Sequence, residues 1–329
     1  MTLPGRKGPF SSPPRVPGFS EYAARFNRTY SGAERGKRQS VYEGKISGFE
    51  AFNARNESFH KGVNRFTDVA DDELAKTYLR RISPDLFAPS DPATSVIGSS
   101  STTRVSVSSS SFFDWSRFMA PVADQGSCGS CYAFAVTATV EGRRNVQSGS
   151  NSTATLSEEE LIDCSDRYGN AACSGGWPGN GYAYIRDNGI CSDTSYGYVG
   201  SKSVCQSKIC SKAIAKKQLT TYSSVRVSKL DVLTALSSGP LSVAVAATVE
   251  WFTYGGGVYT GSCGTSPNHA LSLVGYGFDS SSGKYFWKLK NSWGNSWGES
   301  GYMRLDASDG VNKCGIWNYA QFPLFASTR

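Results

Sequence analysis

Cysteine is distributed very unevenly along this chain of 329 residues. The first 127 residues contain none, and all nine cysteines lie between Cys128 and Cys314. This distribution is typical of a domain that folds in an oxidising compartment and is held by disulfide bonds. Because nine is an odd number, eight cysteines can pair and one is left over. The sequence therefore predicts a cysteine-free N-terminal region followed by a disulfide-bonded domain.

Histidine is scarce, since the chain holds only His60 and His269. Two histidines exclude a histidine-rich metal centre, and we expect no metal and no organic cofactor. The net charge of +7 arises mainly from residues 1–104, with 16 Lys and Arg against 11 Asp and Glu. No basic stripe with interleaved aromatic residues is present, so nucleic acid is not an expected partner. No apolar run reaches the roughly 18–20 residues needed to span a membrane.

Composition divides the chain into four zones. Residues 1–18 are rich in proline, glycine and serine and are predicted to be disordered. Residues 19–82 show helical spacing, and residues 83–111 are serine-rich and are interpreted as an exposed linker. Residues 112–329 contain every cysteine. Residues 1–18 also lack the apolar core of a signal peptide, although paired cysteines imply a secretory route, so we expect the N-terminus to be truncated or misassigned.

Helical patterns precede strand patterns in the cysteine-rich zone. Helices are predicted over about 131–147 and 178–188, with Ser157 and Glu160 in capping-box positions between them. After about residue 219, strands are predicted over 241–247, 269–276 and 284–290. This order favours an α+β fold built from two sub-domains.

One cysteine stands where a nucleophile could be activated. Cys131 is at the predicted start of a helix, a position that lowers the pKa of a thiol. The base must be His269, because His60 lies in the cysteine-free region. Asn291 ends the following strand pattern, and its carbonyl could orient the imidazole, with Trp293 and Trp297 shielding that bond. Gln125 and the Cys131 amide could supply the donors of an oxyanion hole.

Three other interpretations of these residues fail. The stretch Gly294-Asn-Ser-Trp-Gly298 has the form of a serine-hydrolase elbow, but no histidine follows Ser296. A zinc site would need a second cysteine pair or histidines to join Cys128 and Cys131. A thioredoxin-like redox pair would need a surrounding βαβ pattern.

Several motifs together resemble the papain family, and in particular a cathepsin L-type precursor. The stretches that carry the resemblance are Gln125 to Tyr132 (QGSCGSCY), Cys173 to Pro178 (CSGGWP), Asn268-His269-Ala270, Asn291-Ser-Trp293-Gly294, and Trp297 to Tyr302. The resemblance covers about 19–82 and 112–326. It implies a two-lobed protease, with a helical lobe carrying the cysteine and an antiparallel, barrel-like lobe carrying the histidine.

The resemblance also implies roles for single residues. Cys131 would be the nucleophile, His269 its partner, Asn291 the orienting group and Gln125 part of the oxyanion hole. The substrate-binding residues would be Gly129, Gly175, Gly176, Trp177, Pro178, Asn268, Ala270, Trp297 and Tyr319. Tyr319 would stand at the base of the S2 pocket and shorten it, which puts a preference for large P2 residues in doubt. The histidine-bearing loop of the exopeptidase members has no counterpart, which favours an endopeptidase.

By the same analogy, the disulfides would be Cys128–Cys173, Cys164–Cys205 and Cys263–Cys314. Cys191 and Cys210 then remain to pair with each other, and Cys131 stays free.

Residues 19–82 resemble the inhibitory propeptide of this family. The residues of its helical motif are Glu34, Arg38, Tyr42, Lys45, Phe49 and Asn53, and those of the companion motif are Gly62, Asn64, Phe66 and Asp68. The propeptide would cover the cleft as an intramolecular inhibitor until low pH protonates carboxylates such as Asp68. Cleavage is expected within 104–112.

The expected partners are protein and peptide substrates and the chain's own propeptide, with the protein acting as a monomer in a lysosome or vacuole or after secretion. Asn27, Asn56 and Asn151 begin glycosylation sequons. Two alternatives remain open. The chain could be a catalytically silent binding or storage protein, or its N-terminal region could act as an inhibitor of other proteases.

Overall fold

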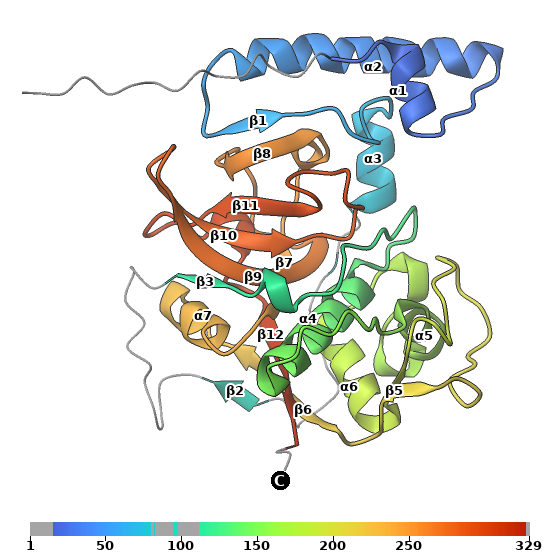
Figure 1. Cartoon of the computed structure of the whole chain (residues 1–329), viewed down its shortest axis with the longest axis vertical. Helices are drawn as coiled ribbons and strands as arrows, with labels where there is room; N and C mark the ends of the chain where they lie inside the picture. The colour runs from blue at the N-terminus through green and yellow to red at the C-terminus, as the bar shows by residue number, and fades with distance from the viewer. Residues whose placement is uncertain (1–15, 80–81, 83–94, 98–111, 327–329) are drawn as a thin grey trace, which may run out of the picture.

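The computed structural model describes residues 16–79, 82, 95–97 and 112–326. Three parts are visible in Figure 1: an N-terminal helical region in blue, a β-sheet in orange and red, and a lobe of green helices beside the sheet. This arrangement confirms the predicted α+β fold, in which helices and strands occupy separate lobes.

The described α-helices are α1 (Phe19–Arg25), α2 (Gly32–Asn53), α3 (Asp71–Tyr78), α4 (Cys131–Ser148), α5 (Glu158–Cys164), α6 (Pro178–Asn188) and α7 (Lys229–Leu236). The described strands are β1 (Phe59–Lys61), β2 (Ser95–Ile97), β3 (Phe113–Asp114), β4 (Ile190–Cys191), β5 (Lys212–Ile214), β6 (Leu219–Val225), β7 (Leu241–Val245), β8 (Tyr254–Tyr259), β9 (His269–Asp279), β10 (Lys284–Lys290), β11 (Tyr302–Asp306) and β12 (Ala320–Phe325).

Helix α4 is the centre of the helical lobe, and it contacts α5, α6 and β9. A helix that is covered on all sides needs apolar residues all round, and the consecutive residues Tyr132, Ala133, Phe134 and Ala135, which point in different directions, are all buried. Its C-terminus is closed by Gly149, which takes the left-handed conformation (φ 67°). The start of this helix at Cys131 agrees with the prediction.

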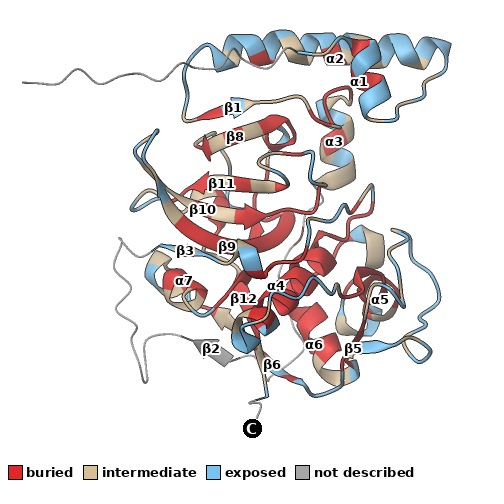
Figure 2. Cartoon of the chain, in the orientation of Figure 1, coloured by how far each residue is buried: buried red, intermediate tan, exposed pale blue. Residues whose placement is uncertain are grey.

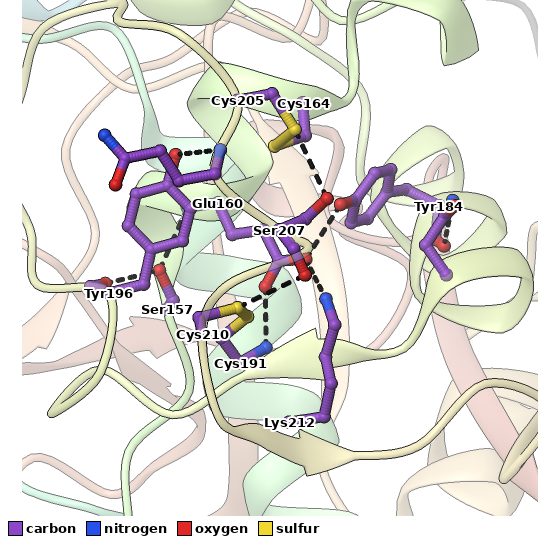
Figure 3. A network of polar contacts seen from close by, with 12 residues as sticks. Ser157, Glu160, Cys164, Tyr184, Cys191, Tyr196, Cys205, Ser207, Cys210 and Lys212 are labelled. Atoms are coloured by element: carbon purple, nitrogen blue, oxygen red, sulfur yellow. Dashed lines mark hydrogen bonds and ion pairs between the residues drawn. A yellow bond between two sulfur atoms is a disulfide. The ribbon is translucent and has the colours of Figure 1, made fainter.

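Helix α5 has only half of the predicted capping box. Ser157 Oγ accepts a hydrogen bond from Glu160 N (2.9 Å), but the Ser157 amide donates to Cys191 O (3.0 Å) instead of to the Glu160 carboxylate. That carboxylate accepts hydrogen bonds from Tyr184 OH (2.8 Å) and Cys191 N (2.6 Å) and pairs with Lys212 Nζ (Figure 3). The predicted bond from the Ser157 amide to the Glu160 carboxylate is therefore wrong. The buried Glu160 side chain instead connects α5 to α6, β4 and β5.

Most strands belong to one sheet, in the order β1-β8-β11-β10-β9-β7-β12-β6-β2, and β3 pairs with β9. Neighbours are antiparallel except in the pairs β8–β11 and β2–β6. In the part of the chain that the structure describes, the end strands β1 and β2 do not pair, so the sheet does not close into a barrel. Both end positions are taken by strands that precede the disulfide-bonded domain. The core of the sheet lobe contains Trp251, Trp287, Trp293 and Trp297, all fully buried.

The N-terminal region is joined to the sheet by the antiparallel pairing of β1 with β8. Strand β8 contains three consecutive glycines, residues 255–257, and these permit a close approach. A Cβ atom at Gly255 would lie 2.9 Å from Gly62 N and 2.9 Å from His60 Cδ2. Helix α2, in contrast, is largely exposed and buries mainly Tyr42 and Phe49 (Figure 2).

Four disulfides join the described cysteines, and Cys131 is free. They are Cys128–Cys173, Cys164–Cys205, Cys191–Cys210 and Cys263–Cys314. Three of them are the pairs that the resemblance implied, and Cys191–Cys210 is the pair that was left over.

The predicted linker is not wholly without structure, because β2 pairs in parallel with β6 at the edge of the sheet. The rest of the linker and residues 1–15 lie outside the described residues, as does nearly all of the cleavage region. Among the residues that the structure describes, no helix is long and apolar enough to span a membrane.

Candidate active site

Cys131 is the first residue of α4, directly after the N-cap position of Ser130. Its side chain is only 3% exposed. Burial raises the pKa of the Cys131 thiol to about 11, while backbone N–H groups of Ala270, Tyr132 and Cys131 itself lower it. Amides at a helix N-terminus stabilise a thiolate. Burial and the helix therefore shift the pKa of the Cys131 thiol in opposite directions, and burial has the larger effect while the thiol is covered.

His269, the first residue of β9, is oriented by Asn291. The His269 Nε2 atom lies 2.8 Å from Asn291 Oδ1. Because a carbonyl oxygen can only accept, Nε2 carries the proton, and Nδ1 of the neutral ring is the basic nitrogen. No described residue forms a hydrogen bond with Nδ1. Burial lowers the pKa of His269 to about 4, although the bond to Asn291 raises it. Trp293 covers the ring at 4.8 Å between centroids.

Gln125 is connected to this pair through Ser292. The Gln125 Oε1 atom accepts a hydrogen bond from Ser292 Oγ (2.6 Å), and Gln125 Nε2 donates one of its two protons to Cys128 O (2.9 Å). The Ser292 amide in turn donates to Asn291 Oδ1 (2.9 Å). Ser292 had no predicted role, because it stands inside a recognised motif but no spacing rule singles it out.

A buried apolar cluster lies beside the thiol. Its members are Ile82, Cys131, Ala135, Trp177, Ala244 and Ala270, with Tyr319 packed against them. The Trp177 and Tyr319 rings meet edge to face at 5.2 Å. The structure thus brings together three of the predicted substrate-binding residues. Ile82 comes from the N-terminal region, is 1% exposed, and donates its amide to Pro267 O (3.2 Å).

Comparison with known proteins identifies both parts of the chain. Residues 109–324 match the model of the papain family of cysteine proteases, and residues 19–74 match the cathepsin propeptide inhibitor domain. The chain belongs to the papain family. It is a cysteine endopeptidase made with an inhibitory propeptide.

Relatives support this over nearly the whole length. Fruit bromelain of Ananas comosus is 36% identical over 322 residues, which cover 95% of this chain and 86% of that protein. A cathepsin L-like proteinase of Phaedon cochleariae is 31% identical, with coverages of 94% and 93%. Among solved structures, the recombinant stem bromelain precursor superposes with a TM-score of 0.83 at 32% identity, covering 94% of this chain and 98% of that chain. Digestive procathepsin L 3 of Tenebrio molitor gives 0.80 at 32% identity, covering 93% and 98%.

The remaining predicted substrate-binding residues of the protease are held by the fold. Gly129 donates its amide to Cys173 O (3.1 Å). Gly176 must be a glycine, because a Cβ atom there would lie 2.8 Å from the Tyr132 ring. Gly175 has a φ of 116°, and Pro178 is the first residue of α6.

Two of the predicted substrate-binding residues, Asn268 and Trp297, form hydrogen bonds within the protease itself. The Asn268 side-chain amide exchanges two hydrogen bonds with the backbone of Ala247 (2.8 and 2.9 Å), so it fixes the chain before His269. Trp297 is fully buried, and its indole donates to Trp251 O (2.8 Å).

The propeptide contacts the protease through the residues of its second motif. Asn64 Nδ2 donates to Phe252 O (2.8 Å), and Phe66 packs against Phe252 and Trp293. Arg65 forms an ion pair with Asp124 of the protease. Asp68 differs, because its partners are propeptide residues: it accepts hydrogen bonds from Tyr22 and Tyr30, and Arg28 lies nearby. Asp68 therefore holds the propeptide's own fold.

The helical motif also stabilises the fold of the propeptide itself. Arg38 pairs with Glu34 (2.6 Å) and with both carboxylate oxygens of Glu73 on α3. The Asn53 side chain exchanges two hydrogen bonds with the backbone of Lys61 (2.8 and 2.9 Å). Other members of this motif are Tyr42, which donates to Pro17 O, Lys45, which donates to Val69 O, and Phe49, which is buried. Gly62 of the second motif lies against Gly255, as described above.

Two further predictions concern groups outside the site. Asn27, Asn56 and Asn151 are all exposed, and their glycosylation stays a prediction. Among the described residues, Glu160, Cys191 and Cys210 place possible metal ligands within 4.8 Å of one another. Since the two sulfurs are bonded to each other, neither is available as a thiolate ligand.

Proposed function

We propose that this protease hydrolyses peptide bonds through an acyl-enzyme on Cys131. His269 Nδ1 takes the thiol proton as Sγ attacks the substrate carbonyl carbon, and the imidazolium then gives that proton to the leaving amine. A water molecule, deprotonated by the same nitrogen, attacks the thioester and regenerates the thiol. The observation that carries this proposal is the bond from His269 Nε2 to Asn291 Oδ1, which leaves Nδ1 as the base.

The oxyanion would be held by the Cys131 amide and by Gln125. The Gln125 side chain is fixed by Ser292 and Cys128, and its second Nε2 proton is available for the substrate oxygen. Donors that are fixed before the reaction stabilise the developing charge without reorganising. We propose that Ser292 acts as a positioning residue, because it bonds to both Gln125 and Asn291.

The propeptide would act as an intramolecular inhibitor. Ile82 packs against Cys131, Trp177 and Ala270, the place where a substrate side chain would bind. Activation would require cleavage within 104–112. A purified precursor that is fully active with this segment intact would contradict the proposal.

The same cluster supports a proposal on the substrate. Tyr319 borders the space that Ile82 occupies, so the P2 pocket is short. We propose that it accepts small or β-branched aliphatic P2 residues and disfavours larger ones such as leucine and phenylalanine. The route of synthesis would be secretory, towards a lysosome, a vacuole or the exterior, which is consistent with four disulfides.

Replacement of Cys131 by alanine tests the mechanism directly. The variant should lose peptidase activity after acid treatment and should not be labelled by a thiol-directed epoxide. Tyr132→Phe is a matched control on the same turn of α4, and it should keep both. Equal peptidase activity in the Cys131→Ala variant would show that another residue is the nucleophile.

A further inference from the structure

A cavity of about 220 Å³, which Asn291 and Ser292 help to line, plays no part in the proposed mechanism. Its walls come from both lobes, with α4 and α5 on one side and the end of β10 on the other. The ionisable side chains that line it are Asp124, Glu141, Glu158, Asp193, Tyr198 and Lys290.

Three of these groups are removed from solvent. Glu141 on α4 is 6% exposed, Glu158 at the start of α5 is 9% exposed, and Lys290 at the end of β10 is 6% exposed. Glu141 accepts one hydrogen bond, from Leu156 N (2.7 Å), and Glu158 accepts one from Thr137 Oγ1 (2.7 Å). Two buried carboxyl groups of the helical lobe therefore share the cavity with one buried ammonium group of the sheet lobe. With all three ionised, one negative charge remains uncompensated.

We propose that Glu141, Glu158 and Lys290 form an acid-dependent clamp between the two lobes, with Lys290 as a positioning residue for Asn291 and Ser292. The clamp closes when one carboxyl group holds a proton, because the remaining carboxylate then balances the ammonium. It loosens when both carboxyl groups ionise, since an uncompensated charge is costly inside a protein.

The pKa values of the cluster agree with this assignment. Burial raises the pKa of Glu141 to about 7, although the attraction of Lys290 lowers it. Burial raises the pKa of Glu158 to about 8, and repulsion by Glu141 and Asp193 adds to that rise. Burial lowers the pKa of Lys290, and the two glutamates raise it in part. Asp124 is compensated separately, by Arg65 of the propeptide.

The direction of the pH dependence follows from these shifts. A carboxyl group with a raised pKa binds its proton more tightly in the folded protein than in the unfolded chain. The stabilisation that this proton gives is complete below about pH 4.5, the ordinary pKa of a glutamate. It is lost as the pH rises through the pKa that the group has in the folded protein. Between pH 5 and pH 7, each such group can accelerate unfolding by up to about tenfold per pH unit.

The first test uses the full chain with Cys131→Ala, in which no autolysis can occur. The unfolding rate in urea, followed by tryptophan fluorescence, is measured at pH 5, 6 and 7. Glu158→Gln keeps the shape of the side chain but cannot ionise, so the rise of the rate with pH should become several-fold smaller per pH unit. Glu141→Gln should act in the same direction. This measurement does not depend on the proposed function.

Glu159→Gln is the matched control. It is the next residue of α5 and is also buried, but its carboxylate accepts hydrogen bonds from Val199 N and Gly200 N and does not line the cavity. It should keep the parental pH dependence. The clamp is refuted if Glu158→Gln and Glu141→Gln keep that dependence as well, or if Glu159→Gln weakens it equally.

The second test rests on the proposed function and uses the activated enzyme. Lys290→Gln leaves both carboxyl groups without a counter-charge, so kcat should fall at pH 7 more than at pH 5, with KM changed less than about twofold. Adding Glu158→Gln to Lys290→Gln should restore part of the lost kcat at pH 7, because one carboxyl group instead of two is then without a counter-charge, whereas a loss of packing alone would not be reversed. If no form of the chain cleaves peptides but the first test succeeds, the proposed function fails and the clamp stands.

Discussion

Replacement of Phe66 by alanine should release the propeptide from the protease. Phe66 is 2% exposed, and its ring meets Tyr78 at 5.3 Å, Phe252 at 5.1 Å and Trp293 at 5.7 Å. Tyr78 belongs to the propeptide, whereas Phe252 and Trp293 belong to the protease. Because Trp293 also covers His269, this contact extends from the propeptide directly to the candidate active site.

The size of the effect can be bounded from these contacts. A change from phenylalanine to alanine in a core costs about 3–5 kcal/mol. If half of this cost falls on docking, the undocked fraction rises by about tenfold or more, since each 1.4 kcal/mol is a factor of ten. If all of it falls on docking, the rise is between about a hundredfold and a few thousandfold.

The assay is the rate at which a thiol-directed epoxide labels Cys131 in the intact full-length chain at pH 6.5. Labelling requires an uncovered thiol, so the rate should follow the undocked fraction and rise at least about tenfold in Phe66→Ala. Phe278→Ala, which alters a partly exposed ring at the far end of β9, is the control and should label as the wild type does. If Phe66→Ala were also labelled at the wild-type rate, the view that this ring keeps Cys131 covered would be refuted.

Three further outcomes are expected. Asn291→Ala should lower kcat by about tenfold to a hundredfold in peptide hydrolysis after activation, because a buried hydrogen bond to His269 worth about 1.5–3 kcal/mol is lost; an unchanged kcat would remove Asn291 from the mechanism. Tyr319→Ala should shift P2 selectivity in a peptide library towards leucine and phenylalanine, and a wild-type enzyme that already prefers them would contradict the short pocket. Burial lowers the pKa of His60, so docking should weaken as the pH falls through about 6.5, and His60→Gln should flatten the rise in Cys131 labelling between pH 7 and pH 5.5.

Local signals predicted much of the fold correctly. Helix α4 was found because Cys131 begins an apolar segment, and α6 because Gly189 stops a helical pattern. Strand β10 was found because Tyr285, Trp287 and Leu289 stand at every second position, the period of a strand. Each of these elements depends on a periodicity or an end signal within a few residues, which a sequence displays directly.

Contacts between distant segments were harder to predict from the sequence. Ser292 was missed as a link, because its two partners stand 167 residues away and next to it in the chain, at Gln125 and Asn291. The position of Ile82 beside Cys131 depends on how the propeptide docks. Similarly, no pattern near Glu158 shows that it shares a cavity with Lys290. The capping box was half wrong for the same reason, since a distant strand supplied stronger partners for Glu160 than the Ser157 amide.

Burial of Cys131 and His269 beneath the propeptide would also keep the candidate catalytic residues of the precursor inactive. On the proposed mechanism, the thiol must give its proton to the imidazole. Burial moves the two pKa values in the direction that prevents this, to about 11 for Cys131 and to about 4 for His269. Both groups are therefore neutral, and a neutral thiol is a poor nucleophile. Removal of Ile82 and Phe66 would admit water to both groups, so the amides at the start of α4 could again favour the thiolate. On the proposed mechanism, inhibition by the propeptide would then be electrostatic as well as steric.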